Sequence, residues 1–302
     1  LKIFIDKSES FLHDPFLMKD MDAAVARIMR ATEGNEKITV YGDYDADGVT
    51  SVSMLLRYFR DRGISADFYI PSREYEGYGM SRDAIDTIAA SGTKLIITVD
   101  TGITAVSEVE YAKSLGIDTV ITDHHQCPEI LPDAVAVINP HRADCGYPYK
   151  DLAGVGVAFK LICALELARE NDGKYNLDTV KDMCRSYISL AAIGTIADVM
   201  PVTGENRIII HIGLGLLRGT EDVSMKSLLC AAGIETDSGR NRKSVLKRIS
   251  VSSIAFGVAP RINAAGRMGD AGRAVQLFMT ESPMLADAIA EELCALDRKS
   301  VV

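Results

Sequence analysis

Between residues 37 and 140, short apolar runs alternate with segments of helical periodicity, and this alternation constrains the fold more than any other feature of the chain. It predicts repeated strand–helix units whose strands pair in parallel. The runs are rich in Val and Ile and lack polar alternation, which is typical of strands covered by helices on both faces. The predicted strands are 38–41, 67–70, 95–99, 119–122 and 134–138. We therefore predict an α/β fold with a doubly wound, mainly parallel five-stranded sheet and a following helical region.

The chain divides around this sheet into three predicted parts. Residues 1–35 form an N-terminal helical segment, 36–201 the domain that holds the sheet, and 202–302 a mixed, mostly helical extension. A last helical pattern begins near Pro283 and continues to the end of the chain, where it looks cut off.

Polar residues that can bind ligands follow nearly every predicted strand. The carboxyl ends of parallel strands meet at one edge of a sheet, and open α/β sheets bind their ligands there. A random scatter of acidic residues would fall as often at the opposite ends. The residues at this edge are Asp43, Asp45, Asp47, Arg73, Asp100, Asp123, His124, His125, Asn139 and His141. Their convergence predicts a functional site.

Asp43, Asp45 and Asp47 are alternating carboxylates, which repel one another unless a cation lies among them. Asp-x-Asp-x-Asp-Gly also begins a calcium-binding EF-hand loop, but the twelfth position is Met54, where that loop needs Glu. A solvated acidic turn is the other alternative. The convergence of the strand ends argues against it.

Asp198 lies within an apolar run, where an unpaired carboxylate would cost several kcal/mol. The candidate metal ligands are Asp45, Asp47, Asp100, His124 and Asp198. Oxygen ligands select Mg²⁺ or Mn²⁺, and the one imidazole favours Mn²⁺. Two such ions sharing a bridging carboxylate, for which Asp100 is the candidate, would support phosphodiester cleavage.

The adjacent His124 and His125 are expected to point to opposite sides of the chain, so one can bind metal while the other reaches a substrate. The alternative is one ligand and one packing or surface histidine. Asp123, directly before them, fits an acceptor that fixes the tautomer of a ring.

Composition limits the other functions that the chain could have. The net charge of −9 argues against a general polyanion-binding surface, and the basic run from Arg240 to Arg248 is better explained as a solvated loop. The six cysteines form no Cys-x-x-Cys pair, which indicates reduced thiols. No apolar stretch is long enough to cross a bilayer and no signal pattern is present, so we expect no membrane association and a cytoplasmic location.

Several motifs together resemble the DHH phosphoesterase superfamily. They are Asp43-Tyr-Asp-Ala-Asp-Gly, Val-Asp100-Thr-Gly, Asp123-His-His125 and Ile-Ala-Asp198-Val. Three further motifs are similar to the RecJ family of bacterial single-stranded-DNA-specific exonucleases. These are Gly77-Tyr-Gly, Leu152-Ala-Gly-Val-Gly-Val-Ala-Phe-Lys and Pro260-Arg-Ile-Asn-Ala-Ala-Gly-Arg-Met.

The resemblance implies a 5′-to-3′ exonuclease that uses Mn²⁺ or Mg²⁺ and releases mononucleotides from single-stranded DNA in recombination and repair. It implies that the five candidate ligands hold the metals, that Asp43 and Asp123 support them, and that His125 contacts the scissile phosphate. The implied phosphate-binding residues are Arg73, Arg261, Asn263 and Arg267. A single-strand-binding protein and a repair helicase are the implied partners besides DNA.

One departure from the family concerns its additional domains. Family members carry a second domain with a Gly-Gly-His motif and an OB-fold, whereas this chain contains no Gly-Gly pair and no segment like an OB-fold. We therefore expect the N-terminal catalytic lobe of a longer protein, which binds metal but degrades DNA poorly. The alternatives are a phosphodiesterase for oligoribonucleotides or cyclic dinucleotides, a pyrophosphatase, and a non-catalytic binding module.

Overall fold

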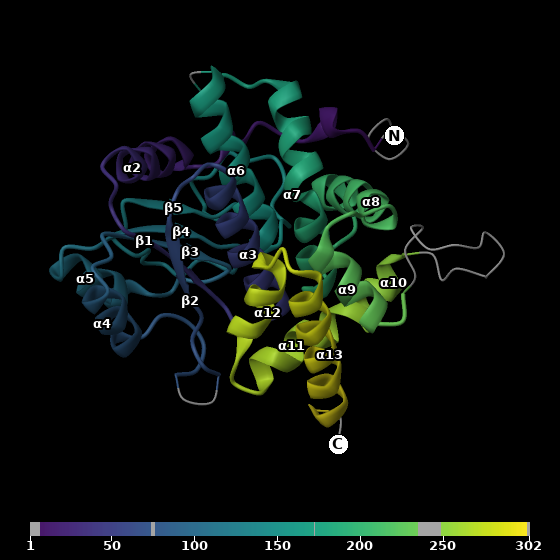
Figure 1. The fold of residues 1–302 in the computed structure, drawn as a ribbon. Helices are drawn as coiled ribbons and strands as arrows, with labels where there is room; N and C mark the ends of the chain where they lie inside the picture. Colours follow the sequence, from purple (N-terminus) through teal and green to yellow (C-terminus); the bar gives the residue numbers. More distant parts are fainter. Residues whose placement is uncertain (1–6, 74–75, 172, 235–248, 301–302) are drawn as a thin grey trace.

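The computed structural model describes residues 7–73, 76–171, 173–234 and 249–300, so the basic run at 240–248 lies outside the described residues. The strands form one parallel sheet in the order β2-β1-β3-β4-β5 (Figure 1). They are β1 (Ile38–Gly42), β2 (Ala66–Tyr69), β3 (Leu95–Val99), β4 (Asp118–Thr122) and β5 (Ala136–Ile138). The predicted five-stranded parallel sheet is confirmed, with every strand end within two residues of its predicted position.

Helices cover both faces of the sheet, because successive side chains of each strand point to opposite sides. Along β3, Leu95 and Ile97 belong to one hydrophobic cluster and Ile96 to another. The first cluster includes residues of α2 (Met21–Glu33), α3 (Ala46–Asp61) and α6 (Gly154–Asn171). The second includes residues of α4 (Arg82–Ala90) and α5 (Val106–Ser114). The sheet is therefore doubly wound, as predicted.

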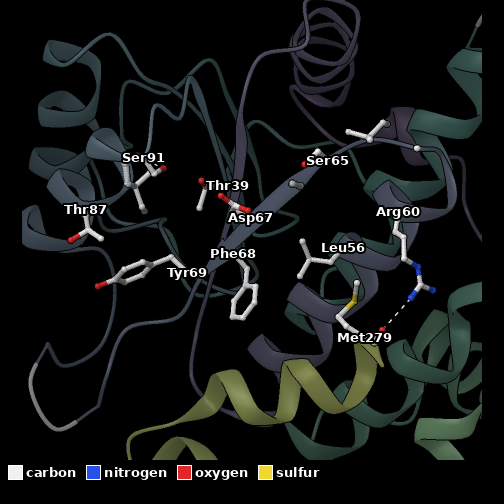
Figure 2. A pocket seen from close by; sticks show the side chains of 14 residues that line it. Thr39, Leu56, Arg60, Ser65, Asp67, Phe68, Tyr69, Thr87, Ser91 and Met279 are labelled. Carbon is white, nitrogen blue, oxygen red and sulfur yellow. Dashed lines mark hydrogen bonds between the residues drawn. The ribbon is translucent and has the colours of Figure 1, made fainter. Parts of the chain in front are cut away.

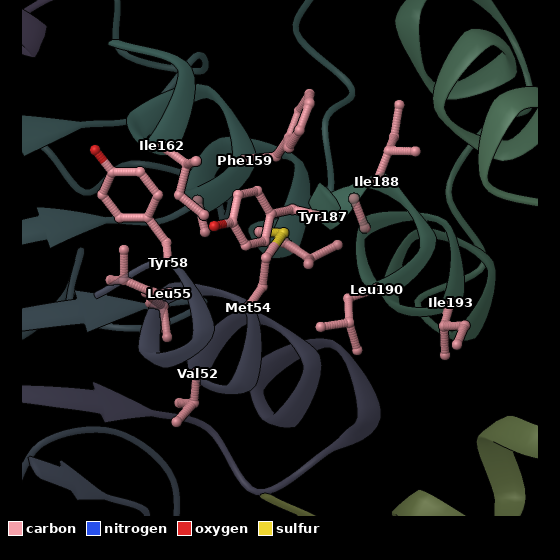
Figure 3. Packing of buried hydrophobic residues seen from close by; sticks show 14 of the residues in the cluster. Val52, Met54, Leu55, Tyr58, Phe159, Ile162, Tyr187, Ile188, Leu190 and Ile193 are labelled. Atoms are coloured by element: carbon pink, nitrogen blue, oxygen red, sulfur yellow. The ribbon is translucent and has the colours of Figure 1, made fainter. Parts of the chain in front are cut away.

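A helical layer packs on the outer side of α3. Met54 of α3 is fully buried, and Figure 3 shows it among side chains of α6 and of α7 (Leu177–Ala197), including Phe159 and Ile188. The position at which an EF-hand would place its Glu ligand is thus part of the core. This burial agrees with the exclusion of a calcium loop.

The remaining helices extend this layer. They are η1 (Glu9–Phe11), η2 (Pro15–Leu17), α8 (Gly204–Arg218), α9 (Val223–Ala231), α10 (Val251–Ser253), the π-helical turn η3 (Ile254–Val258), α11 (Ala259–Arg267), α12 (Ala271–Met279) and α13 (Pro283–Ser300). Helices α11 and α12 pack against α3, and α13 packs against α9 and α11 (Figure 1). The domain bounds at 35/36 and 201/202 stay predictions. Among the described helices, none combines the length and the apolar character needed to cross a membrane.

Candidate metal centre

The candidate site lies where the strand order of the sheet reverses. In the sheet, β1 lies between β2 and β3, and the strand order reverses between β1 and β3. In open α/β sheets the ligand site lies at such a switch point. The loop after β1 carries Asp43 and Asp45, and Asp100 follows β3 directly. The fold therefore brings these carboxylates to the position where open α/β sheets bind ligands.

Backbone groups at two helix N-termini orient the acidic loop. Asp45 is the N-cap of α3, and its side chain accepts a hydrogen bond from Gly48 N at 3.0 Å. Asp47 accepts from the first residues of α6, with Gly154 N at 2.7 Å from its Oδ2 and Val155 N at 2.9 Å from its Oδ1. The positive end of the α6 dipole thus stabilises the Asp47 carboxylate.

His124 Nε2 lies close to carboxylates from three different elements. It is 3.2 Å from Asp100 Oδ1, 3.6 Å from Asp198 Oδ2 and 3.9 Å from Asp47 Oδ2. Among the side-chain atoms that the structure describes, Asp100 Oδ1 and Asp198 Oδ2 are buried and have no hydrogen-bond partner, and the same is true of Asp43 Oδ1. Buried polar atoms without partners are rare in proteins, so these oxygens are suited to bind a cation.

The donor atoms form three groups, in each of which all atoms lie within 4.8 Å of one another. One group is Asp47, His124 and Asp198, another is Asp43, Asp45 and Asp100, and the third, Asp100, His124 and His125, overlaps both. Because Asp100 also lies 3.2 Å from His124 Nε2, its carboxylate connects the donor groups. This donor set of carboxylates with one imidazole fits Mn²⁺ or Mg²⁺.

Burial, and then the proximity of other carboxylates, raises the pKa values of four aspartates at the site. Burial, followed by the charge of Asp45, raises the pKa of Asp43 to about 7 and that of Asp198 to about 6. Burial also raises the pKa of Asp47 and of Asp100 well above the ordinary range, and neighbouring carboxylates add to it. A bound divalent cation would reverse these shifts, because positive charge favours the ionised form.

The surroundings of His124 favour its neutral imidazole form. Burial, followed by the proximity of His125, lowers the pKa of His124 to about 4, and its ring also interacts with the Leu152 backbone. A neutral ring that is hydrogen-bonded on one nitrogen presents the lone pair of the other to a metal.

Asp123 organises the segment that contains both histidines. It is fully buried, and its Oδ1 accepts hydrogen bonds from His124 N at 2.7 Å and His125 N at 3.1 Å. The same oxygen lies 2.8 Å from His125 Nδ1, and this hydrogen bond raises the pKa of His125. Asp123 therefore acts on the orientation of His125, whose side chain remains 45% exposed.

Comparison with known proteins decides the family. The DHH family, N-terminal domain, matches residues 37–195. The chain belongs to the DHH family. The single-stranded-DNA-specific exonuclease RecJ of Bacillus subtilis (strain 168) is 42% identical to it over 298 residues, which cover 99% of this chain and 35% of that protein.

Solved RecJ structures agree with this assignment. The crystal structure of exonuclease RecJ bound to manganese matches with a TM-score of 0.80 at 31% identity, over 96% of this chain and 67% of that one. RecJ from Thermus thermophilus in complex with Mg²⁺ matches with a TM-score of 0.65 at 28% identity, over 93% of this chain and 35% of that one. The predicted resemblance to RecJ is confirmed, and this chain spans about a third of the length of the Bacillus subtilis relative.

Three of the predicted phosphate-binding residues lie near the acidic loop or on α11. Arg73 and Asn263 contact residues 44–46, and Arg267 lies at the end of α11. Arg73 is exposed, and its guanidinium carbon lies 5.7 Å from the centre of the Tyr44 ring. Asn263 Oδ1 accepts a hydrogen bond from Ala46 N at 2.7 Å, which ties α11 to the start of α3. Arg267 is exposed at the last residue of α11.

Arg261 is placed differently, against α13. Its Nε donates to Cys294 Sγ at 3.0 Å, and its Nη1 lies 3.7 Å from Asp297 Oδ2. In this arrangement its guanidinium is engaged in helix packing. Its assignment to phosphate binding stays a prediction.

Asn139 and His141 follow β5 and contact the backbone of the two adjacent histidines. Asn139 Nδ2 donates to His125 O at 2.9 Å, and His141 Nδ1 lies 2.6 Å from His124 O. These contacts fix the backbone of both histidines. Their position after the predicted strand 134–138 was the signal, but only the fold shows which carbonyl groups they bind.

A large cavity of the molecule lies away from the metal centre. Its volume is about 760 Å³, and it runs along the edge strand β2, between α3, α4 and the end of α12 (Figure 2). Its lining includes Leu56, Phe68 and Met279 but none of the candidate metal ligands. The candidate metal centre is therefore identified by its donor atoms and not by this cavity.

Proposed function

We propose that this chain is the metal-dependent catalytic lobe of a 5′-to-3′ exonuclease that releases mononucleotides from single-stranded DNA. The observation that carries the proposal is the pair of buried carboxylate oxygens without hydrogen-bond partners, Asp100 Oδ1 and Asp198 Oδ2, beside His124 Nε2. Such atoms need a cation. The relatives are named single-stranded-DNA-specific exonucleases. One RecJ structure is bound to manganese, and another is in complex with Mg²⁺.

Two of the donor groups would supply the ligands of Mn²⁺ or Mg²⁺. One ion would be held by Asp47, His124 and Asp198, and a second by Asp43 and Asp45, with Asp100 shared between them. Bound ions would supply the Lewis acidity that phosphodiester hydrolysis requires. The resemblance implied that Asp43 supports the metal ligands. Its place beside Asp45 and Asp100 leads us to propose it as a metal ligand itself.

The other residues bind and orient the substrate. His125, held by Asp123, donates to an oxygen of the scissile phosphate, and its raised pKa favours the imidazolium form that does so. Arg73 and Arg267 offer forked donors to the phosphate on the 5′ side, with Asn263 beside them. Arg261 joins them if its contacts with α13 open when DNA binds.

The resemblance also extends to the cellular setting. We propose that the complete protein acts in the cytoplasm in recombination and repair, on DNA that a single-strand-binding protein covers and a repair helicase opens. The N-terminal segment 1–35, the DHH domain 36–201 and the extension 202–302 are the proposed divisions of this chain.

Hydrolysis under single-turnover conditions tests the proposal, because excess chain makes slow cleavage measurable. The chain is mixed with Mn²⁺ and a 5′-phosphorylated single-stranded octanucleotide, and the products are separated. We expect mononucleotides that require Mn²⁺ and that disappear in Asp100→Asn. A duplex of the same sequence serves as the control and should resist cleavage.

The same assay distinguishes the alternatives. Faster hydrolysis of short RNA, a cyclic dinucleotide or pyrophosphate than of the DNA would assign a different substrate within the DHH family. DNA binding without any cleavage, unchanged in Asp100→Asn, would instead indicate a binding module.

A further inference from the structure

Tyr78 places its hydroxyl group beside the histidine that faces the substrate. The hydroxyl oxygen lies 3.3 Å from His125 Nδ1 and 3.5 Å from His125 Nε2. The two rings meet edge to face, with centroids 5.8 Å apart and an interplanar angle of 69°. Tyr78 is nevertheless 51% exposed, so part of its ring is open to a bound molecule.

The backbone on both sides of Tyr78 is built to hold it in this position. Gly77 has φ +80° and Gly79 has φ +91°, which only glycine adopts at low cost, and within the described residues no atom lies within 4 Å of a Cβ at either position. Conformation, not lack of space, therefore requires these glycines. The carbonyl of Gly79 accepts a hydrogen bond from the buried Tyr41 hydroxyl at 2.9 Å, which anchors the segment to β1.

Hydrogen bonding at His125 leaves the Tyr78 hydroxyl available for a ligand. His125 Nδ1 is already bonded to Asp123 Oδ1 at 2.8 Å, so this nitrogen has no second proton for Tyr78. The hydroxyl group of Tyr78 is a further hydrogen-bond donor at this point, and the side chain is half exposed. A hydroxyl donor beside a candidate cation site matches a non-bridging oxygen of a phosphodiester.

We propose that Tyr78 is a substrate-contacting residue whose hydroxyl donates a hydrogen bond to the same phosphate oxygen as His125. This inference rests on the proposed phosphodiesterase function. Negative charge on the phosphoryl oxygens changes as hydrolysis proceeds, and donors aimed at that charge act mainly on the chemical step. The hydroxyl of Tyr78 therefore affects kcat more than KM.

Tyr78→Phe tests this inference, because it removes the hydroxyl and keeps the ring. With saturating Mn²⁺ and bis(p-nitrophenyl) phosphate as substrate, we expect kcat to fall by about 10- to 100-fold, as for other single donors of this kind, with KM changed less than about 3-fold. Mn²⁺ affinity, measured by calorimetry, should stay the same. Tyr111→Phe is the matched control, because the hydroxyl of Tyr111 in α5 donates to Asp86 in α4 at the surface, and its loss should leave kcat unchanged.

The variant His125→Ala distinguishes direct contact between Tyr78 and the phosphate from an effect of Tyr78 that is transmitted through His125. In His125→Ala, the further change Tyr78→Phe should still lower kcat if the hydroxyl touches the phosphate. No further loss, or an unchanged kcat in the single variant, would overturn the inference. If the chain without substitutions hydrolyses neither bis(p-nitrophenyl) phosphate nor the octanucleotide, the proposed function itself is wrong.

Discussion

Asp100 belongs to two of the three groups of donor atoms at the candidate metal centre. It has φ +58°, an unfavourable backbone conformation for a residue with a Cβ, and it is almost fully buried. Gly154 lies so close that a Cβ there would come within 2.5 Å of Asp100 Cβ, and a Cβ on Gly266 would come within 2.1 Å of Tyr44 O. Helices α6 and α11 thus approach the carboxylates through glycines, and larger side chains at these points would displace them.

Gly154→Ala adds one methyl group and tests whether Mn²⁺ binding depends on the close approach of α6 to Asp100. The added Cβ must push Asp100 or the start of α6 away, so we expect Mn²⁺ affinity to fall by at least about 10-fold, within the range seen for disturbed metal surroundings. Calorimetric titration with Mn²⁺ measures the effect.

Gly215→Ala is the control for that substitution. Gly215 is an exposed residue of α8 with no atom within 4 Å of a Cβ, so alanine should leave Mn²⁺ affinity unchanged and stabilise the helix by about 0.5–1 kcal/mol. Equal Mn²⁺ affinity in both variants would show that the contact with Asp100 is unimportant.

Helix α3 connects the metal centre to the C-terminal helices. Its first turn carries Asp47, and its second half carries Arg57, whose Nε donates to Phe278 O in α12 at 2.7 Å and whose Nη2 donates to Ser224 Oγ in α9 at 2.8 Å. Arg57 also pairs with Asp222, the N-cap of α9. One side chain therefore holds two helices of the extension 202–302 on the domain that contains the sheet.

Arg57→Met removes these bonds and keeps most of the apolar stem. We expect the free energy of unfolding to fall by about 2 kcal/mol, since hydrogen bonds to a charged group are lost in a partly buried place. Urea unfolding measures the change. Arg30→Met is the matched control, because Arg30 forms an exposed pair with Asp118 that should contribute less than about 1 kcal/mol.

The Arg57 effect should depend on pH with a definite sign. Burial opposes ionisation of Asp222, but the hydrogen bond from Arg57 outweighs it and holds the pKa of Asp222 below its ordinary value. A carboxyl whose pKa is lowered by folding stabilises the protein above its unfolded pKa and loses that contribution as pH falls. The difference between the parent chain and Arg57→Met should thus be constant at neutral pH and shrink below about pH 4. A difference that grows on acidification would contradict this assignment.

At the scale of the whole molecule, a buried ion pair joins the N-terminal segment to α6 and α8. Lys160 and Glu205 are 2% and 1% exposed at their side chains, with Lys160 Nζ 2.5 Å from Glu205 Oε1. Tyr147 donates to Glu205 Oε2 at 2.6 Å, and His13 N donates to Oε1 at 2.9 Å. Every oxygen of this carboxylate is therefore satisfied, unlike those of the metal centre.

Glu205→Ala would leave the Lys160 ammonium buried without its partner. We expect a loss of about 3–5 kcal/mol in the free energy of unfolding, measured in urea. The double variant Lys160→Met with Glu205→Leu should recover a large part of that loss, because no charge then remains buried. A single variant as stable as the parent chain would show that the pair contributes nothing.

The sequence allowed the sheet to be predicted, and it named most of the candidate metal ligands that the fold brings together, for a local reason. Runs of Val and Ile mark buried strands, and parallel strands deliver the residues that follow them to one edge, which brought Asp100 and His124 into the set. The contact between Gly154 N and Asp47 joins residues 107 positions apart, and no periodicity reveals it. The same holds for Tyr78 and for the packing of Arg261 on α13, which depend on tertiary structure.

Anomalous diffraction from crystals of this chain soaked in Mn²⁺ tests the central claim most directly. We predict two peaks about 3.5–4 Å apart on either side of the Asp100 carboxylate, one beside Asp47, His124 and Asp198 and the other beside Asp43 and Asp45. Anomalous peaks elsewhere, with none beside Asp100, would contradict the assignment of this site.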